Sequence, residues 1–229
     1  MTFVSVVVPT YNEAGSLPVL VDRLAKAFAG REWELVVVDD GSPDGTADIA
    51  ESLGKAHPIR VVRRPGKAGL ASAVLAGFAT AKGDVLLVMD ADLSHPPEVA
   101  PKLADAIASG ADLAVGSRYV AGGGVMDWPM KRQVVSRVAC LMGQVLVPVR
   151  DSTSGFFALR RSVIDGVTLN PIGFKIGFEV MARGKYNRVV ELPYTFRDRE
   201  HGASKFGQRE IFQYVKQLGQ VARDKHRRG

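Results

Sequence analysis

Strand-like and helix-like segments alternate through the first half of this 229-residue chain, and that alternation limits the folds open to it. Short apolar runs typical of buried strands occur at 3–8, 34–39, 59–63, 84–89 and 111–115. Between them, segments such as 17–28 and 70–78 carry apolar residues at helical spacing. Alternating strands and helices predict a parallel sheet with right-handed crossovers. We therefore predict an α/β fold, a mostly parallel sheet flanked by helices, in a single domain.

The second half is less regular. A glycine-rich loop runs from 121 to 129, an amphipathic helix is expected over 131–146, and 154–159 has the composition of a strand. A polar loop over 197–208 precedes a last helix and a basic tail. This order predicts that the sheet is completed by strands from both halves of the chain.

Composition excludes several protein classes. The chain is 46% hydrophobic and 24% charged, an ordinary globular balance. No stretch approaches the roughly 20 apolar residues of a membrane span, so no transmembrane domain is expected. The only cysteine, Cys140, precludes an internal disulfide and is expected to be a buried thiol in a reducing compartment. The net charge of +6 favours an anionic partner.

The sequence Asp90-Ala91-Asp92 directly follows an apolar run and is the feature of the chain that tells most about its chemistry. Two carboxylates at the end of a buried strand lie where ligands bind in open α/β sheets. Neighbouring anions repel each other unless a cation lies between them. Mg²⁺ or Mn²⁺, which shares its coordination shell with substrate phosphates, is the natural candidate.

Polar loops also follow the first two strands, in the sequences PTYNE and DDGSPDGT. They should meet the aspartate turn at one sheet edge, where a nucleotide would bind. Tyr11 is a candidate to stack on a base, and Asp40 a candidate to accept base N–H groups. The chain has no GxGxxG after the first strand and no GxxxxGK[ST], which argues against dinucleotide dehydrogenases and P-loop enzymes.

The ordered set PTYNE, DDGSPDGT, DADLSHPP, GSRY and TSGFF resembles the inverting family-2 glycosyltransferases of the GT-A fold. With VVELPYTF and RDREHGASKF it is closest to the dolichol-phosphate (polyprenol-phosphate) mannose synthases. The resemblance covers nearly the whole chain. It implies a Rossmann-like GT-A catalytic domain over 1–229, with a nucleotide-binding half of about 1–116 and an acceptor-binding half of about 117–229.

The resemblance also implies roles for individual residues. The residues expected to bind the nucleotide sugar are Pro9, Tyr11, Glu13, Val38, Asp40, Asp90, Ala91, Asp92, Arg199 and Lys205. The metal, Mg²⁺ or Mn²⁺, is expected at Asp90, Asp92 and Ser94, where some relatives carry glutamine in place of Ser94. The acceptor phosphate is expected at Arg118, Arg132 and Ser136. Asp92 and Arg118 are the residues expected to be catalytic.

By the same resemblance, the reaction is inverting, metal-dependent transfer of mannose from GDP-mannose to dolichyl or polyprenyl phosphate, giving polyprenyl β-phosphomannose and GDP. The acceptor lies in a membrane, so the chain is expected to be cytoplasmic and peripheral on the cytoplasmic face, with a possible membrane-anchoring subunit. The basic tail and the helix over 131–146 could dock on an anionic bilayer. That helix could equally pack only on the core.

Other functions stay open at this point. A polyprenyl-phosphate glucosyltransferase using UDP-glucose, or a related enzyme with another acceptor, would carry the same motifs. A basic module that binds nucleic acid would interleave aromatic and basic residues on an exposed face. Aromatic residues make up only 7% of the chain, so no nucleic-acid partner is expected. A nucleotide-binding regulator without turnover is disfavoured by the intact aspartate and arginine motifs.

Overall fold

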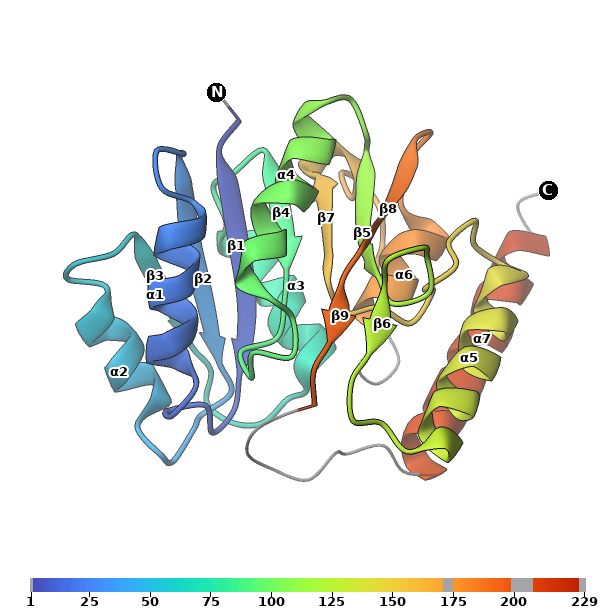
Figure 1. The fold of residues 1–229 in the computed structure, drawn as a ribbon, viewed down its shortest axis with the longest axis horizontal. Coiled ribbons are helices and arrows are strands. Elements are labelled where there is room, and N and C mark those ends of the chain that lie inside the picture. Colours follow the sequence, from blue (N-terminus) through green and yellow to red (C-terminus); the bar gives the residue numbers. More distant parts are fainter. Residues whose placement is uncertain (1, 171–174, 199–207, 227–229) are drawn as a thin grey trace.

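The structure is a computed structural model that describes residues 2–170, 175–198 and 208–226 (Figure 1). In these ranges a seven-stranded sheet has the order β3-β2-β1-β4-β7-β5-β8, and β6 and β9 form a separate parallel pair. The strands are β1 (Val4–Thr10), β2 (Trp33–Asp39), β3 (Ile59–Arg63), β4 (Val85–Val88), β5 (Leu113–Ser117), β6 (Gly124–Val125), β7 (Phe157–Arg160), β8 (Val189–Pro193) and β9 (Thr195–Phe196).

Helices cover both faces of the large sheet (Figure 1). The α-helices are α1 (Leu17–Ala27), α2 (Thr46–Leu53), α3 (Leu70–Thr80), α4 (Ala100–Ala108), α5 (Met130–Gln144), α6 (Ile176–Arg183) and α7 (Gln208–His226). Short 3₁₀ turns occupy Pro97–Val99 and Arg161–Val163. No helix in the described ranges is long and apolar enough to cross a bilayer.

The predicted α/β architecture is confirmed, with one strand running against the others. β1, β2, β3 and β4 are parallel, as are β5 and β8, whereas β7 pairs antiparallel with both β4 and β5. Phe157 of β7 is opposite Val88 on one side and Val115 on the other. A strand from the second half of the chain therefore joins two strands of the first half.

Side-chain alternation in the strands gives the sheet two cores. Val6 and Val8 of β1 pack on one face with α1, α2 and α4, while Val7 packs on the other with α3, α6 and α7. All three valines are fully buried, as expected for a strand with helices on both sides. The sheet and its helices thereby fix the loops at the carboxyl ends of the strands.

Several boundaries differ from the sequence expectations. The strand expected over 154–159 begins only at Phe157, because Ser154 turns inward and its hydroxyl donates a hydrogen bond of 2.7 Å to the Gly116 carbonyl. Strands β8 and β9 did not stand out in the sequence. β8 is the edge strand next to β5, and most of its side chains are only half-buried. Its sequence therefore lacks the continuous apolar run of a fully buried strand.

Gly77 lies in α3 where the helix crosses the sheet, and a Cβ there would overlap with Cγ1 of Val7. We expect Gly77→Ala to lower the free energy of unfolding by about 1–3 kcal/mol, because the added methyl overpacks a filled core. Gly219 in α7 is the matched control, since a Cβ there meets nothing within 4 Å. Gly219→Ala should raise stability by about 0.5–1 kcal/mol through helix propensity. Urea denaturation measures both changes. If both variants changed the free energy of unfolding in the same direction, this account of the packing would be contradicted.

Candidate active site

A cavity of about 1040 Å³ opens at the carboxyl ends of β1, β2 and β4. Its walls come from the loops after these strands, the start of α3, one side of α5 and residues of α6 and α7. The expected residues that line it are Pro9, Tyr11, Glu13, Asp40, Asp90, Ala91, Asp92, Arg118, Arg132 and Ser136. The fold thus brings residues expected for the nucleotide, the metal and the acceptor phosphate to one cavity.

The turn after β4 directs both carboxylates of the aspartate motif into the cavity. Leu93, the next residue, has a φ of 64°, a left-handed conformation that costs a residue with a side chain about 1–2 kcal/mol. His95 stabilises the turn, because the backbone N–H of Asp90 donates a 3.0 Å hydrogen bond to its Nδ1. Nδ1 accepts this bond and so carries no proton. The His95 ring also stacks on Phe156, with ring centroids 5.0 Å apart. Strain held by tight packing is typical of functional turns.

The side chains at this turn fit a hard divalent cation that takes part of its shell from substrate. Asp90 and Asp92 both line the cavity, and no group of three His, Cys, Asp or Glu residues suited to a metal occurs in the described ranges. Two carboxylates that leave coordination positions open to substrate match Mg²⁺ or Mn²⁺ bound together with phosphate oxygens. Ser94 is almost fully buried and does not line the cavity, and its Oγ has no hydrogen-bond partner among the described residues. Its backbone N–H donates to Oδ1 of Asp92 at 3.1 Å, so the contribution seen is to orient that carboxylate.

The expected nucleotide side of the cavity contains Tyr11 and Asp40. The ammonium of Lys67 lies 3.9 Å from the centroid of the Tyr11 ring. Asp40 is buried, and its carboxylate accepts hydrogen bonds from Arg64 at 2.7 Å and from two backbone N–H groups, those of Ala68 and Gly69. Asp40 therefore fixes the loop before α3 in addition to any contact with a base.

For three expected nucleotide-sugar residues the structure shows no contact with the cavity, one because it is buried elsewhere and two because they are not among the described residues. Val38 is fully buried and packs in the core on the α3 side, so its side chain does not reach the cavity. Arg199 and Lys205 lie outside the described residues. The roles of all three stay predictions.

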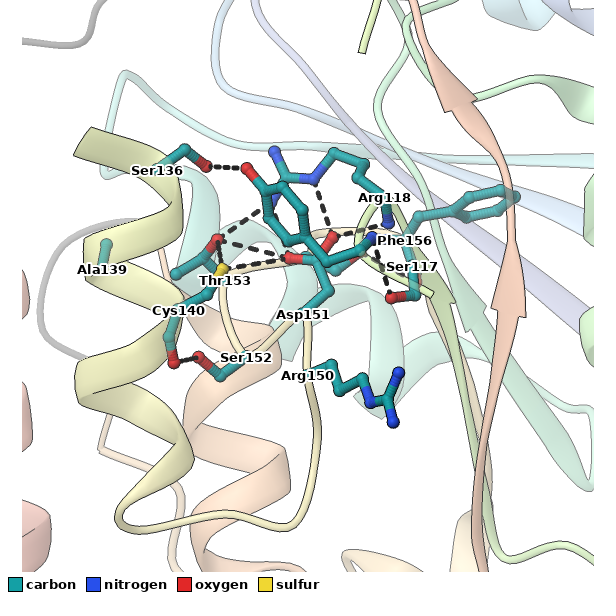
Figure 2. Close-up of polar contacts among 12 residues, drawn as sticks. Ser117, Arg118, Ser136, Ala139, Cys140, Arg150, Asp151, Ser152, Thr153 and Phe156 are labelled. Carbon is teal, nitrogen blue, oxygen red and sulfur yellow. Dashed lines mark hydrogen bonds and ion pairs between the residues drawn. The ribbon is translucent and has the colours of Figure 1, made fainter. Parts of the chain in front are cut away.

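Arg118, which lines the cavity, forms a buried ion pair with Asp151 (Figure 2). Nε and Nη2 of Arg118 donate to the two carboxylate oxygens at 2.7 Å each, and the Arg118 backbone N–H donates to Oδ2 at 2.9 Å. Nη2 also donates to Thr153 Oγ1 at 2.9 Å. The Nε and Nη2 groups of Arg118 are thus both used to bind Asp151. A phosphate bound in the cavity would contact Arg118 through its Nη1 group.

This pairing decides the charge state of the cluster. Burial alone would lower the pKa of Arg118, but the adjacent carboxylate outweighs it and raises that pKa. Burial alone would raise the pKa of Asp151, and Arg118 instead holds it below its ordinary value. Cys140 lies beside both, 3.2 Å from Thr153 Oγ1, and burial raises the pKa of its thiol to about 11. The prediction of a buried thiol is confirmed.

Arg132 and Ser136 lie on α5 one turn apart, and both face the cavity. The Arg132 guanidinium stacks 4.0 Å from the centroid of the Trp128 ring and donates to Asp198 at 2.7 Å. The Ser136 hydroxyl accepts a 2.8 Å hydrogen bond from the Tyr119 hydroxyl. Both residues expected to bind the acceptor phosphate are therefore held in position by neighbouring aromatic side chains.

Lys175 is a cavity residue that sequence reasoning missed. It precedes α6, and its Nζ donates to the Thr153 carbonyl at 3.1 Å. Burial, reinforced by the nearby Arg118 charge, lowers the pKa of this amine to about 8. The aromatic wall of Trp128 and Phe196, with ring centroids 5.2 Å apart, was also missed. No sequence signal marks these residues, since their partners lie far away along the chain.

A family model described as glycosyl transferase family 2 matches residues 5–171. Among curated proteins, a dolichol-phosphate mannosyltransferase of Pyrococcus furiosus is 50% identical over 219 residues, covering 94% of this chain and 62% of its own length. A polyprenol monophosphomannose synthase of Mycolicibacterium smegmatis is 44% identical, over 87% of this chain and 79% of its own. A dolichol-phosphate mannosyltransferase of Saccharomyces cerevisiae is 39% identical, over 95% and 86%. The chain thus spans less than two thirds of the Pyrococcus protein.

Solved structures share the fold at low sequence identity. The glucosyl-3-phosphoglycerate synthase of Mycobacterium tuberculosis, in complex with Mn²⁺, UDP and glucosyl-3-phosphoglycerate, superposes with a TM-score of 0.68 at 20% identity, over 96% of this chain and 78% of that one. The mannosyl-3-phosphoglycerate synthase of Rubrobacter xylanophilus gives 0.66 at 20%, over 99% and 74%. These likenesses confirm the expected GT-A architecture.

Proposed function

The chain belongs to glycosyl transferase family 2, and we propose that it transfers mannose from GDP-mannose to a dolichyl or polyprenyl phosphate with inversion at the sugar. One observation carries the proposal: the paired carboxylates Asp90 and Asp92 and the arginines Arg118 and Arg132 line the same cavity. A carboxylate pair suits a cation bound to the donor diphosphate, and the arginines suit a second phosphate. The names printed for the curated relatives support the choice of sugar and acceptor.

The chemical task is to bring two anionic substrates together. Two phosphate charges about 5 Å apart repel by roughly 3 kcal/mol at an effective dielectric near 20. Arg118 and Arg132 offset that repulsion on the acceptor side, since both are charged and fixed in place. Fixed positive groups stabilise the charge that develops during transfer without reorganising.

On the donor side, Asp90 and Asp92 would hold Mg²⁺ or Mn²⁺, with Ser94 orienting Asp92. When bound, the cation supplies charge neutralisation for the leaving diphosphate. A neighbour of the same fold, the glucosyl-3-phosphoglycerate synthase, was solved with Mn²⁺ and UDP, which supports a divalent cation in the proposed reaction. Arg199 and Lys205 would add charge from the segment before α7. The acceptor phosphate is already anionic at neutral pH, so no strong general base is required.

Tyr11, Glu13 and Asp40 would bind the nucleotide, together with Pro9, Ala91 and the Val38 segment. The acceptor resides in a bilayer, so we further propose a peripheral position on the cytoplasmic face of a membrane. A membrane-anchoring subunit would satisfy the same requirement. No nucleic acid is part of this proposal.

A donor screen tests the function directly. With polyprenyl phosphate as acceptor, we expect radiolabelled lipid product from GDP-mannose, and a yield from UDP-glucose at least about tenfold lower, because a binding site that pairs with one base leaves polar groups unpaired with another. Removal of divalent cations with EDTA should abolish product, and Mn²⁺ or Mg²⁺ should restore it. Product from UDP-glucose alone would make the chain a glucosyltransferase. Absence of product from either donor would contradict the proposal.

A further inference from the structure

Lys175 lies where the protein itself stabilises an ammonium group poorly. It is the N-cap residue of α6, next to the positive end of the helix dipole. Burial is the main reason that the pKa of its amine falls to about 8, and the charge of Arg118 lowers that pKa more than the charge of Asp151 raises it. The buried Arg118–Asp151 pair therefore presents its positive end to Lys175. Groups with such perturbed pKa values are typical of functional sites.

The packing of α6 fixes the position of this amine. Gly177, in the first turn of α6, leaves no room for a Cβ, because the Ser154 carbonyl lies against it. The backbone of Lys175 is held as well, since its carbonyl accepts a hydrogen bond of 3.2 Å from the Glu179 N–H. From there the side chain reaches the neighbouring Thr153, and Nζ donates to its carbonyl at 3.1 Å. The ammonium group is therefore held at a defined place in the cavity wall.

Thr153 brings two cations together. Its carbonyl accepts the hydrogen bond from Lys175, and its Oγ1 accepts one of 2.9 Å from Nη2 of Arg118. Both Lys175 and Arg118 line the cavity. Two positive groups that are held by one residue repel each other, and an anion bound beside both removes that repulsion.

Each arginine expected to bind the acceptor phosphate is already matched by a carboxylate. Asp151 pairs with Arg118, and Asp198 pairs with Arg132, each at 2.7 Å. Neither carboxylate is among the described residues that line the cavity. The two ion pairs add no net charge to this side of the cavity, whereas Lys175 adds a positive charge there.

We propose that the Lys175 ammonium binds the phosphate group of the acceptor beside Nη1 of Arg118, and that it makes the site selective for a phosphate monoester over a neutral alcohol. The identity of this phosphate as the acceptor rests on the proposed function. A phosphate monoester has oxygens for both cations, whereas the hydroxyl of an alcohol cannot compensate the charge of Lys175. Opposing the larger effect of burial, the charge of Asp90 raises the pKa of this amine, so Lys175 is within electrostatic reach of the donor side as well.

Isothermal titration calorimetry with geranyl phosphate, a short and water-soluble isoprenyl phosphate, tests the site without any reaction. Lys175→Met keeps most of the stem of the side chain and removes its charge. It should weaken binding about 10- to 100-fold, the effect of losing one hydrogen bond to a charged group. Lys175→Arg should recover most of the affinity, because it restores a cation. Equal affinities of the wild type and Lys175→Met for geranyl phosphate would overturn the proposal.

The corresponding alcohol, geraniol, tests the selectivity. The wild type should bind geraniol at least about tenfold more weakly than geranyl phosphate, and this difference should shrink in Lys175→Met. A difference of the same size in the two proteins would show that Lys175 does not distinguish phosphate from alcohol, and would overturn the selectivity.

Lys185 provides the matched control. Its Nζ also donates to a backbone carbonyl, that of Asp165 at 2.9 Å, but the residue is exposed and does not line the cavity. Lys185→Met should bind geranyl phosphate as the wild type does. The unfolding midpoint of Lys175→Met should be nearly unchanged, since the end of the repulsion from Arg118 offsets the lost hydrogen bond to the Thr153 carbonyl. A large fall in that midpoint, with a loss of binding that Lys175→Arg does not recover, would make Lys175 a structural residue and overturn the proposal.

The phosphate site and the proposed reaction can fail separately. With GDP-mannose as donor, Lys175→Met should raise the KM for a soluble polyprenyl phosphate about tenfold or more and leave the KM for GDP-mannose within about twofold. Weaker binding of geranyl phosphate by Lys175→Met, without any mannosyl product from the wild type, would retain the phosphate site and overturn the reaction. Mannosyl product from the wild type, with the same acceptor KM in Lys175→Met, would retain the reaction and overturn the phosphate site.

Discussion

Asp151→Ala is expected to lower the free energy of unfolding by about 3–5 kcal/mol, because it leaves the Arg118 charge buried without its partner. The Asp151 carboxylate is fully buried and accepts hydrogen bonds from Nε, Nη2 and the backbone N–H of Arg118. Removal of the carboxylate takes the acceptor from all three of these donors. Chemical denaturation monitored by circular dichroism measures the loss.

The matched control for Asp151→Ala is an exposed pair with the same bidentate geometry. Nε and Nη2 of Arg23 donate to the two oxygens of Glu98 at 2.8 and 2.7 Å, and both side chains are partly exposed. Glu98→Ala should cost no more than about 1 kcal/mol, because solvent compensates a surface ion pair. Similar losses for the two variants would contradict the role assigned to burial. For activity, Asp151→Asn keeps the shape of the side chain, and we expect a larger rise in KM for the acceptor than for the donor.

Asp92→Ala is expected to lower kcat/KM at least about 100-fold at saturating Mn²⁺, because the site loses half of its carboxylate pair. The change should leave the unfolding midpoint in EDTA nearly unchanged, since the removal of one of two neighbouring anions offsets the loss of the hydrogen bond from the Ser94 backbone N–H. Loss of activity without loss of stability separates a binding role from a structural one. The measurement is a steady-state assay across a Mn²⁺ titration together with thermal unfolding.

The control for Asp92→Ala is Asp22→Ala on α1, whose carboxylate pairs only with Lys26 on an exposed surface among the described contacts. It should retain full activity. Activity of Asp92→Ala within threefold of wild type at saturating Mn²⁺ would overturn the metal assignment. A loss that added Mn²⁺ fully reverses would mean that Asp92 contributes affinity for the cation and that Asp90 suffices for the chemistry.

Local sequence patterns predicted the elements well where one periodicity dominates. The run before Asp90 contains only apolar residues, so a buried strand ending at that turn could be inferred without a structure. Most of the predicted site residues that line the cavity belong to ordered motifs at strand ends, such as Tyr11, Asp92 and Arg118, whereas Arg132 and Ser136 lie on α5. For these residues, a few neighbouring positions in the sequence indicate both the functional group and its place at the end of a strand.

Pairings between distant residues could not be predicted in this way. Arg118 and Asp151 are 33 positions apart, and nothing in either local sequence indicates that they meet. The same holds for Asp40 and the backbone of Gly69, 29 positions away, and for Lys175, which enters the cavity from the start of α6. Nor does periodicity give the order of strands, since a buried antiparallel strand such as β7 has the same apolar pattern as a parallel one.

The position of β7 has a consequence for synthesis of the chain on the ribosome. β4 and β5 are translated early, but each keeps an unpaired edge until β7, ending at Arg160, has emerged to fill the gap between them. An emerging chain of about half length therefore exposes two apolar strand edges of the kind that recruit other strands. The fold is closed by a segment that arrives late, so the first and second halves of the chain must mature together as one cooperative unit.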